Sequence, residues 1–201
     1  MKVNDFLAKA HLALKSHTQY CSGGFGVVLK GAQLDRYCNN YTWNKNHEAK
    51  IRKAAETQPC YGFDCVCLVK GILWGWDANP DKIYGGAAYK SNDVPDITAQ
   101  GMIKACTDVS TDFSKIQPGE VLYLESSPHI GIYIGDGLAI EATASWDCCV
   151  MKTAVTNIKS ATGGLHGRKW TKHGKLPWVD YSESGKPEMT CPCCGARFVL
   201  A

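Results

Sequence analysis

The chain has 201 residues, of which 45% are hydrophobic and 20% are charged, so it can bury one hydrophobic core, alone or with a small appendage. Its formal net charge of +3 is too small to indicate a nucleic-acid partner, and no run of about 18 apolar residues predicts a membrane span. Eleven cysteines cannot all pair within the chain, which favours reduced thiols over a secreted disulfide scaffold.

The first half of the chain is expected to be mainly helical. The N-terminal residues lack the long apolar run and the cleavage site of a signal peptide, so a cytoplasmic protein is expected. Apolar positions at helical spacing predict a helix over residues 3–16, and further helices are expected over 44–57, 64–74 and 98–106. The stretch 77–97 is rich in Gly, Pro, Asp and Asn and is expected to be a loop.

The second half of the chain is expected to form strands. "IQPGEVLYLESSPHIGIYIGDGLAIEAT", residues 116–143, alternates β-branched and aromatic residues with turn signals and predicts three antiparallel strands. One more strand is expected within residues 164–181. Helices followed by strands favour an α+β fold.

A cysteine at the head of the third predicted helix is a candidate nucleophile. Asp64 can cap this helix, and Cys65 would lie in its first turn, where the helix dipole lowers the pKa of a thiol. Cys67 lies about 200° further round the helix and is expected to pack in the core. A buried, inert Cys65 is the alternative, because free cysteines are so often buried.

A nucleophilic cysteine needs a base, and His129 at the start of a predicted strand is the candidate. A two-residue turn in the following hairpin would send Glu141 to the opposite face from His129. A three-residue loop over residues 135–137 pairs His129 with Thr143 and puts Glu141 on the same face. This second register also gathers the apolar side chains on one face, so we prefer it.

These residues form a predicted catalytic triad. Cys65 would attack a carbonyl, His129 would transfer the proton, and Glu141 would orient the imidazole. The chemistry would be acyl transfer by a thiolate, without a metal.

Three motifs in order resemble those of the NlpC-type family of cell-wall cysteine peptidases. They are "FDCVCLV" at 63–69, "PGEVLYL" at 118–124 and "HIGIYIGDG" at 129–137. The resemblance covers roughly residues 15–150 and implies a papain-like α+β fold, with N-terminal helices packed on an antiparallel sheet. It also implies that Cys65, His129 and Glu141 are the catalytic residues.

A further family element, Tyr-x-x-Gly-Gly, is similar to residues 20–24 here and implies that Tyr20 lies close to the nucleophile and assists at the oxyanion. About forty residues separate Tyr20 from Cys65 where the family has a handful, so an insertion over about 25–60 is inferred, with its place beside the substrate groove. Val66 and Cys67 replace the usual Ser-Gly pair, which bears on the shape of the groove. The sequence turns polar at "SESGKPE", residues 182–188, and this expected linker divides the chain into a peptidase domain, 1–181, and a tail, 182–201.

The resemblance implies a peptidoglycan hydrolase, similar to the endolysins and endopeptidases of prophages, that waits in the cytoplasm until it is released to the wall. Its expected substrates are stem peptides, commonly cut between D-glutamate and the diamino acid. Tyr20, Asp64 and Trp146 are candidate substrate-binding residues, although buried core packing is the commoner outcome for a tryptophan. The alternatives are an amidase or acyltransferase with the same triad, or a non-catalytic wall-binding protein.

The tail contains the sequence "CPCCG" at 191–195, in which Cys191 and Cys194 have the spacing of a zinc knuckle. A closed zinc site needs two further ligands, to which a second chain or any of five side chains could contribute. Those side chains are Cys193, Cys148, Cys149, His166 and His173. A structural zinc in a small targeting or dimerising module is one interpretation, and a tail with reduced thiols is the other.

Overall fold

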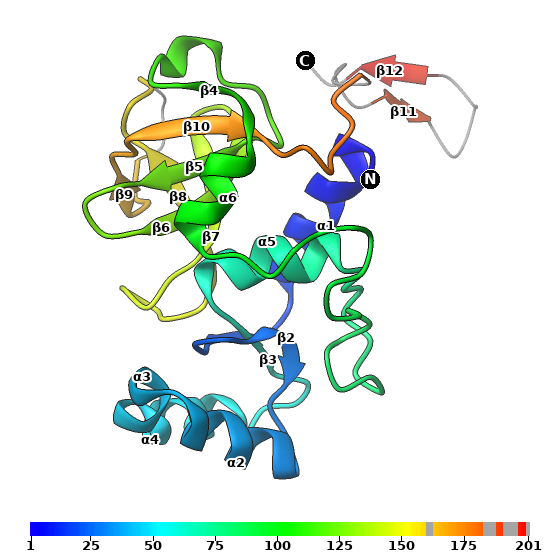
Figure 1. Ribbon diagram of the computed structural model, residues 1–201, viewed down its shortest axis with the longest axis vertical. Helices are drawn as coiled ribbons and strands as arrows, with labels where there is room; N and C mark the ends of the chain where they lie inside the picture. Colours follow the sequence, from blue (N-terminus) through cyan, green and yellow to red (C-terminus); the bar gives the residue numbers. More distant parts are fainter. Residues whose placement is uncertain (160–162, 183–187, 191–196, 200–201) are drawn as a thin grey trace.

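The computed structural model describes residues 1–159, 163–182, 188–190 and 197–199 and shows a mixed α+β fold (Figure 1). The helices are α1 (Val3–Lys15), α2 (Gly31–Asn40), α3 (Thr42–Asn46), α4 (Glu48–Ala54), α5 (Cys65–Leu73) and α6 (Ala99–Ala105), with a 3-10 turn at Phe113–Lys115. The predictions for α1, α5 and α6 are confirmed, as is the loop over 77–97.

One helix was predicted over residues 44–57, and this prediction is wrong. The chain instead forms two short helices, α3 and α4, which are separated at His47, where the backbone leaves the helical region. The helix α2 was not predicted. Only Tyr37 and Cys38 of α2 are buried, so its apolar pattern is too sparse for the sequence to show it.

The strands of the described residues form three sheets. They are β1 (Thr18–Tyr20), β2 (Phe25–Val28), β3 (Tyr61–Phe63), β4 (Thr107–Ser110), β5 (Val121–Leu124), β6 (His129–Gly135), β7 (Leu138–Ala142), β8 (Val150–Val155), β9 (Gly167–Arg168), β10 (Lys172–Lys175), β11 (Glu188–Thr190) and β12 (Arg197–Val199). The large sheet has the order β4-β10-β5-β6-β7-β8-β9, the small one β1-β3-β2, and β11 pairs with β12. The three antiparallel strands β5, β6 and β7 were predicted and are confirmed.

The β6–β7 hairpin has the preferred register but not the expected loop. Ile132 faces Ile140, as that register requires. Gly135 pairs with Leu138, however, so the turn contains two residues, and a β-bulge between Tyr133 and Gly135 restores the register. The turn residues Asp136 and Gly137 both have positive φ angles, the conformation that two-residue hairpin turns favour.

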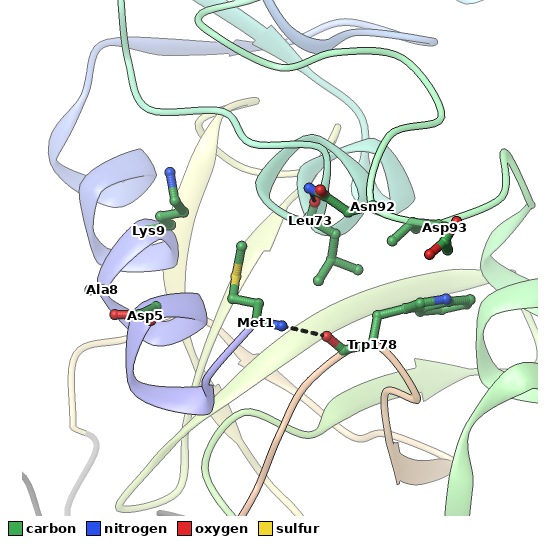
Figure 2. Close-up of a pocket in the computed structure, with 9 residues that line it drawn as sticks. Met1, Asp5, Ala8, Lys9, Leu73, Asn92, Asp93 and Trp178 are labelled. Carbon is green, nitrogen blue, oxygen red and sulfur yellow. Dashed lines mark hydrogen bonds between the residues drawn. The ribbon is translucent and has the colours of Figure 1, made fainter.

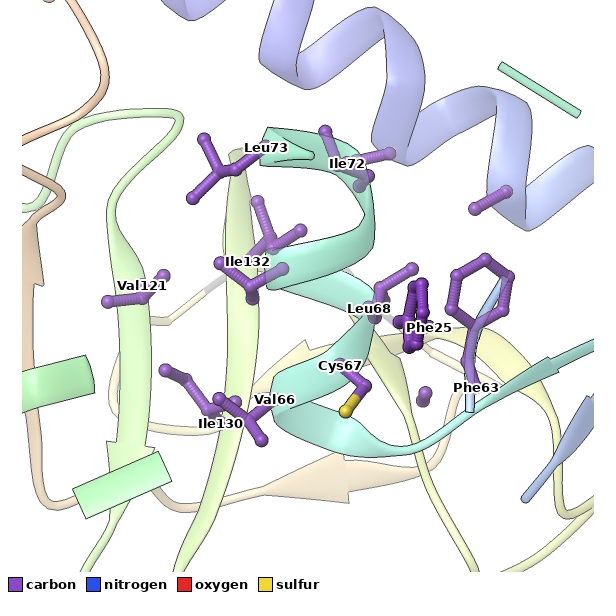
Figure 3. Close-up of a cluster of buried hydrophobic side chains, with 14 of the residues drawn as sticks. Phe25, Phe63, Val66, Cys67, Leu68, Ile72, Leu73, Val121, Ile130 and Ile132 are labelled. Atoms are coloured by element: carbon purple, nitrogen blue, oxygen red, sulfur yellow. The ribbon is translucent and has the colours of Figure 1, made fainter. Parts of the chain in front are cut away.

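The main core lies between α5 and the large sheet. Figure 3 shows Val66 and Leu73 of α5 beside Ile130 and Ile132 of β6 and Val121 of β5. Because α5 is covered on nearly all sides, its residues from 66 to 73 are all buried, including Cys67 as predicted. This packing holds the head of α5 against the start of β6.

The small sheet joins α5 to the helices α2, α3 and α4, which lie at the bottom of Figure 1. A second apolar cluster fills this part of the molecule, with Val27, Leu29, Tyr37 and Ile51 among its members. Three cysteines, Cys21, Cys38 and Cys60, are also buried there, and all eight described cysteines are free.

A cavity of about 680 Å³ lies where α1, the loop before α6 and Trp178 meet (Figure 2). The amino group of Met1 donates a hydrogen bond to the carbonyl of Trp178 there, at 3.0 Å. Of the described residues, those lining this cavity include none of the predicted site residues. Within the described ranges, no helix is both long and apolar enough to cross a bilayer.

Candidate active site

The strand β3 leads directly into α5, and Asp64 stands at the junction. Its Oδ1 accepts a hydrogen bond from the N–H of Cys67 at 2.7 Å, which confirms the predicted helix cap. Its Oδ2 accepts one from the N–H of Gly23, also at 2.7 Å. Asp64 therefore fixes the turn between β1 and β2 to the head of α5, with both oxygens used by backbone donors.

Cys65 is the first residue of α5 and is partly exposed. Burial, followed by the charge of Asp64, raises the pKa of its thiol to about 12, although hydrogen bonding with the backbone of Ile130 and Val66 lowers it. The predicted lowering of this pKa by the helix dipole is therefore wrong, because desolvation outweighs it. In the resting protein Cys65 is a neutral thiol, and its contact with Ile130 places it one residue from His129 along β6.

His129 and Glu141 form a close pair between β6 and β7. The Nε2 of His129 lies 2.5 Å from the Oε2 of Glu141, whose side chain is 0% exposed. Burial raises the pKa of Glu141, but the hydrogen bond with His129 and the charge of Arg168 outweigh it and keep the pKa below its usual value. The ionised carboxylate holds the proton of the imidazole on Nε2, which leaves Nδ1 as the free nitrogen for proton transfer.

The structure thus places the three predicted catalytic residues in one region. Cys65 begins α5, which packs against β6 where His129 lies, and Glu141 orients His129 from the neighbouring strand. A thiol, an imidazole and a buried carboxylate in this order can perform nucleophilic attack with general acid–base catalysis.

Two residues beside the pair were not predicted. Arg168 of β9 donates from Nε to both oxygens of Glu141, at 3.2 and 3.0 Å. The ring of Trp170 stacks on that of His129, with centroids 5.7 Å apart and an interplanar angle of 15°. Both lie in "GRKW", and no pattern in the sequence indicates that this segment pairs in parallel with β8.

Tyr20 lies at the end of β1, across from Phe63 of β3, which is two residues before Cys65. Burial, and then the proximity of Cys65 and Asp64, raises the pKa of Tyr20 far above its usual value, so the hydroxyl stays a neutral donor. Its ring packs edge-to-face on Trp43, with centroids 4.8 Å apart. Tyr20 is therefore near the head of α5, as the resemblance implies.

Trp146 is 38% exposed and, like Trp170, contacts the guanidinium of Arg168. Its ring stacks on that of His166, with centroids 4.7 Å apart, and the guanidinium of Arg168 is 4.9 Å from its centroid. An exposed ring linked through Arg168 to Glu141 is available to a ligand.

A cavity of about 790 Å³ lies beside the head of α5, between α2 and the loop over 77–97. Asp64 and Cys67 contribute from the helix, and the segment 25–60 contributes Arg36, Tyr37 and Tyr41. Phe25, Trp74, Tyr84 and Tyr89 add further aromatic side chains to the lining. The segment 25–60 therefore borders a cavity next to the candidate site.

The proposed zinc ligands Cys191 and Cys194 lie outside the described residues, as does Cys193. Within the described ranges, no group of three or more side chains could hold a metal ion. His173 is buried against Glu120, and His166 is stacked on Trp146.

The chain is similar to the peptidoglycan hydrolase RipB from Mycobacterium tuberculosis, with a TM-score of 0.44 and 15% sequence identity. The match covers 86% of this chain and 63% of that chain, so it spans less than two thirds of RipB in that structure. No family model and no curated protein sequence matches the chain.

Proposed function

We propose that this protein is a peptidoglycan hydrolase that cleaves an amide bond in the stem peptide through an acyl-enzyme intermediate. The observation that carries the proposal is the 2.5 Å contact between Nε2 of His129 and Oε2 of Glu141. Ile130, the next residue along β6, contacts the Cys65 thiol through its backbone, so the pair lies beside the nucleophile. A buried carboxylate that fixes an imidazole beside a thiol is the arrangement that acyl transfer requires.

In the first step the Sγ of Cys65 bonds to the amide carbonyl carbon, and the thiol proton passes to Nδ1 of His129. Because the pKa of the thiol is about 12, this transfer accompanies the attack. His129 then gives the proton to the leaving amine as the C–N bond breaks. In the second step His129 takes a proton from water, and the hydroxide adds to the thioester carbonyl carbon. The C–S bond then breaks, which releases the carboxylic acid, and His129 returns the proton to the Cys65 sulfur.

The oxyanion of each tetrahedral intermediate needs donors that are already in place. The backbone N–H of Cys65 lies at the head of α5, where the helix leaves such groups without helical partners. The neutral hydroxyl of Tyr20, held near Cys65 by the β1–β3 pairing, is the second donor in this proposal.

The motifs that resemble the NlpC-type family support the substrate class. They favour a stem peptide as the substrate, with the bond between D-glutamate and the diamino acid as the site of cleavage and a cysteine endopeptidase of endolysin type as the enzyme. Trp146 is exposed beside Arg168, which makes it the candidate to contact the substrate at this end of the site. Asp64 would act through the backbone that it holds, since both of its oxygens are already bonded.

The test is mass spectrometry of purified peptidoglycan digested by the reduced wild-type protein and by Cys65→Ala, with several wall chemotypes. A new amine terminus within the stem peptide, present only with the wild type, would support the proposal and identify the bond. Separation of sugar from peptide would overturn the endopeptidase in favour of an amidase. Unchanged fragments with every chemotype would overturn the hydrolase itself and favour a wall-binding protein.

A further inference from the structure

We infer that Arg168 is a positioning residue that holds Glu141 in place, as an anion, against His129. Its catalytic consequence rests on the proposed function, whereas its effect on Glu141 can be measured without any substrate. The side chain of Arg168 bonds directly to Glu141, one member of the predicted triad.

Arg168 and Glu141 make a two-oxygen contact across three strands. Nε of Arg168 lies 3.2 Å from Oε1 and 3.0 Å from Oε2 of Glu141. Thr153 of β8 donates to Oε1 at 2.7 Å, and His129 contacts Oε2. Every direction in which the carboxylate could rotate therefore breaks a hydrogen bond, so its orientation toward His129 is fixed.

The charge of Glu141 needs a partner because its side chain is fully buried. Among the described residues that bond to its carboxylate, Arg168 is the one whose side chain is always charged, because a guanidinium does not lose its proton in proteins. Arg168, 17% exposed, lowers the pKa of Glu141 by its charge and its hydrogen bond, in addition to the larger lowering by His129, and so favours the ionised carboxylate.

The guanidinium is itself in contact with two aromatic rings. Its carbon lies 4.9 Å from the ring centroid of Trp146 and 5.6 Å from that of Trp170, and Nη2 donates to Thr143 at 3.3 Å. A planar, delocalised cation suits this position, whereas the ammonium of a lysine has neither the fork nor the flat face. The contacts therefore require arginine and not just a positive charge.

The test compares Arg168→Gln with Arg168→Lys, and both with Arg52→Gln as a matched control. Arg52 is exposed and pairs with Asp35 and Glu48 on α2 and α4, away from the β-strands that carry Glu141. The first readout is the ¹³C titration of the Glu141 carboxyl in a Cys65→Ala background. Arg168→Gln should raise its midpoint by about one pH unit, as loss of a close opposite charge does. Arg168→Lys should raise it less, and Arg52→Gln should leave it unchanged.

The second readout is the kinetics of stem-peptide cleavage. Arg168→Gln should lower kcat at least tenfold with little change in KM, and move the acid limb of the pH profile in the same direction as the Glu141 titration. Arg168→Lys should recover part of kcat. A folded Arg168→Gln with an unchanged Glu141 titration would overturn the inference, as would a lysine variant that equals wild type in both readouts. If the wild type cleaves no peptide, the titration still decides the inference while the proposed function fails.

Discussion

Gly131 leaves the space that the ring of Trp170 occupies behind His129. A Cβ at this position would lie 2.9 Å from Cη2 and 3.1 Å from Cζ2 of Trp170, and that ring is almost fully buried. Gly131→Ala should therefore cost about 1–3 kcal/mol of stability, the usual range for overpacking a filled core. It should also lower kcat, because Trp170 stacks on His129 and contacts Arg168. Urea unfolding and peptide cleavage measure the two effects.

The matched control at this scale is Gly163→Ala. Among the described residues, and apart from its chain neighbours, no heavy atom lies within 4 Å of a Cβ built there. Its unfolding free energy should stay within about 0.5 kcal/mol of wild type. Equal losses in the two variants would show that the effect comes from replacing glycine in general and not from Trp170.

The helix α5 links Asp64 to the acidity of the nucleophile. The charge of Asp64 raises the pKa of Cys65, second only to burial, so Asp64→Asn should lower that pKa. Cys65 should then react faster with iodoacetamide near neutral pH, measured by mass spectrometry of the peptide that carries it. The variant should also lose about 1 kcal/mol, because an asparagine oxygen can replace only one of the two acceptors that Cys67 and Gly23 use. An unchanged alkylation rate in the folded variant would contradict this electrostatic effect, and the exposed Asp81→Asn serves as the control.

A second buried histidine–carboxylate pair joins β10 to the start of β5. Burial lowers the pKa of His173, but its hydrogen bonds with Glu120 and the carbonyl of Asp112 outweigh this and hold it above the ordinary 6.5. Because folding raises the pKa of His173, the charged histidine stabilises the folded protein fully below pH 6.5. This stabilisation is lost as the pH rises through the pKa of His173 in the folded state. The gap in unfolding free energy between wild type and His173→Gln should therefore narrow from pH 6 to pH 9. Urea unfolding under reducing conditions measures it, and a constant gap would be inconsistent with a role for the charged histidine.

At the scale of the whole molecule, the parts that the sequence predicts are those built from local patterns. The helix α5 follows from Asp64 and a continuous apolar run, and the hairpin register follows from alternation, since shifting it by one residue would bury Glu141 with the isoleucines. The pair of His129 and Glu141 could be placed on one face for this reason. The bulge that produces the register was not predicted. A glycine at position 135 can adopt the backbone angles of either the two-residue turn with a bulge or the three-residue loop, so the sequence does not distinguish them.

What could not be predicted depends on contacts between distant segments. Arg168 reaches Glu141 only because β9 adds in parallel to β8, across a separation of 27 residues along the chain. The acidity of Cys65 was misjudged for a related reason. A helix dipole can be seen in the sequence, whereas desolvation comes from the strands that cover the helix after folding.

Two buried or half-buried carboxylates link separate parts of the molecule and should govern its stability in acid. Glu141 joins β7 to β6, β8 and β9, and Asp96 joins the loop before α6 to Lys70 of α5 and to Tyr89. Burial raises the pKa of each carboxyl, but hydrogen bonds and positive partners outweigh it, so both lie below their ordinary values of 4.5 and 3.8. Because folding lowers both pKa values, each carboxylate stabilises the folded protein fully at a pH above its ordinary pKa. This stabilisation is lost as the pH falls through the lower pKa of the folded state.

The unfolding free energy of the wild type should therefore drop steeply between pH 5 and pH 3. In Glu141→Gln and in Asp96→Asn the unfolding free energy should change less steeply with pH over this range. Because the two carboxylates share no partner, their effects on the slope should add in the double variant. At neutral pH Glu141→Gln should cost about 3 kcal/mol, since it leaves Arg168 as a buried cation without its carboxylate. Urea unfolding across this pH range measures all three variants. A double variant with the wild-type slope would place acid sensitivity elsewhere in the chain, whereas an additive loss would show that these two links hold the sheet and the helices together.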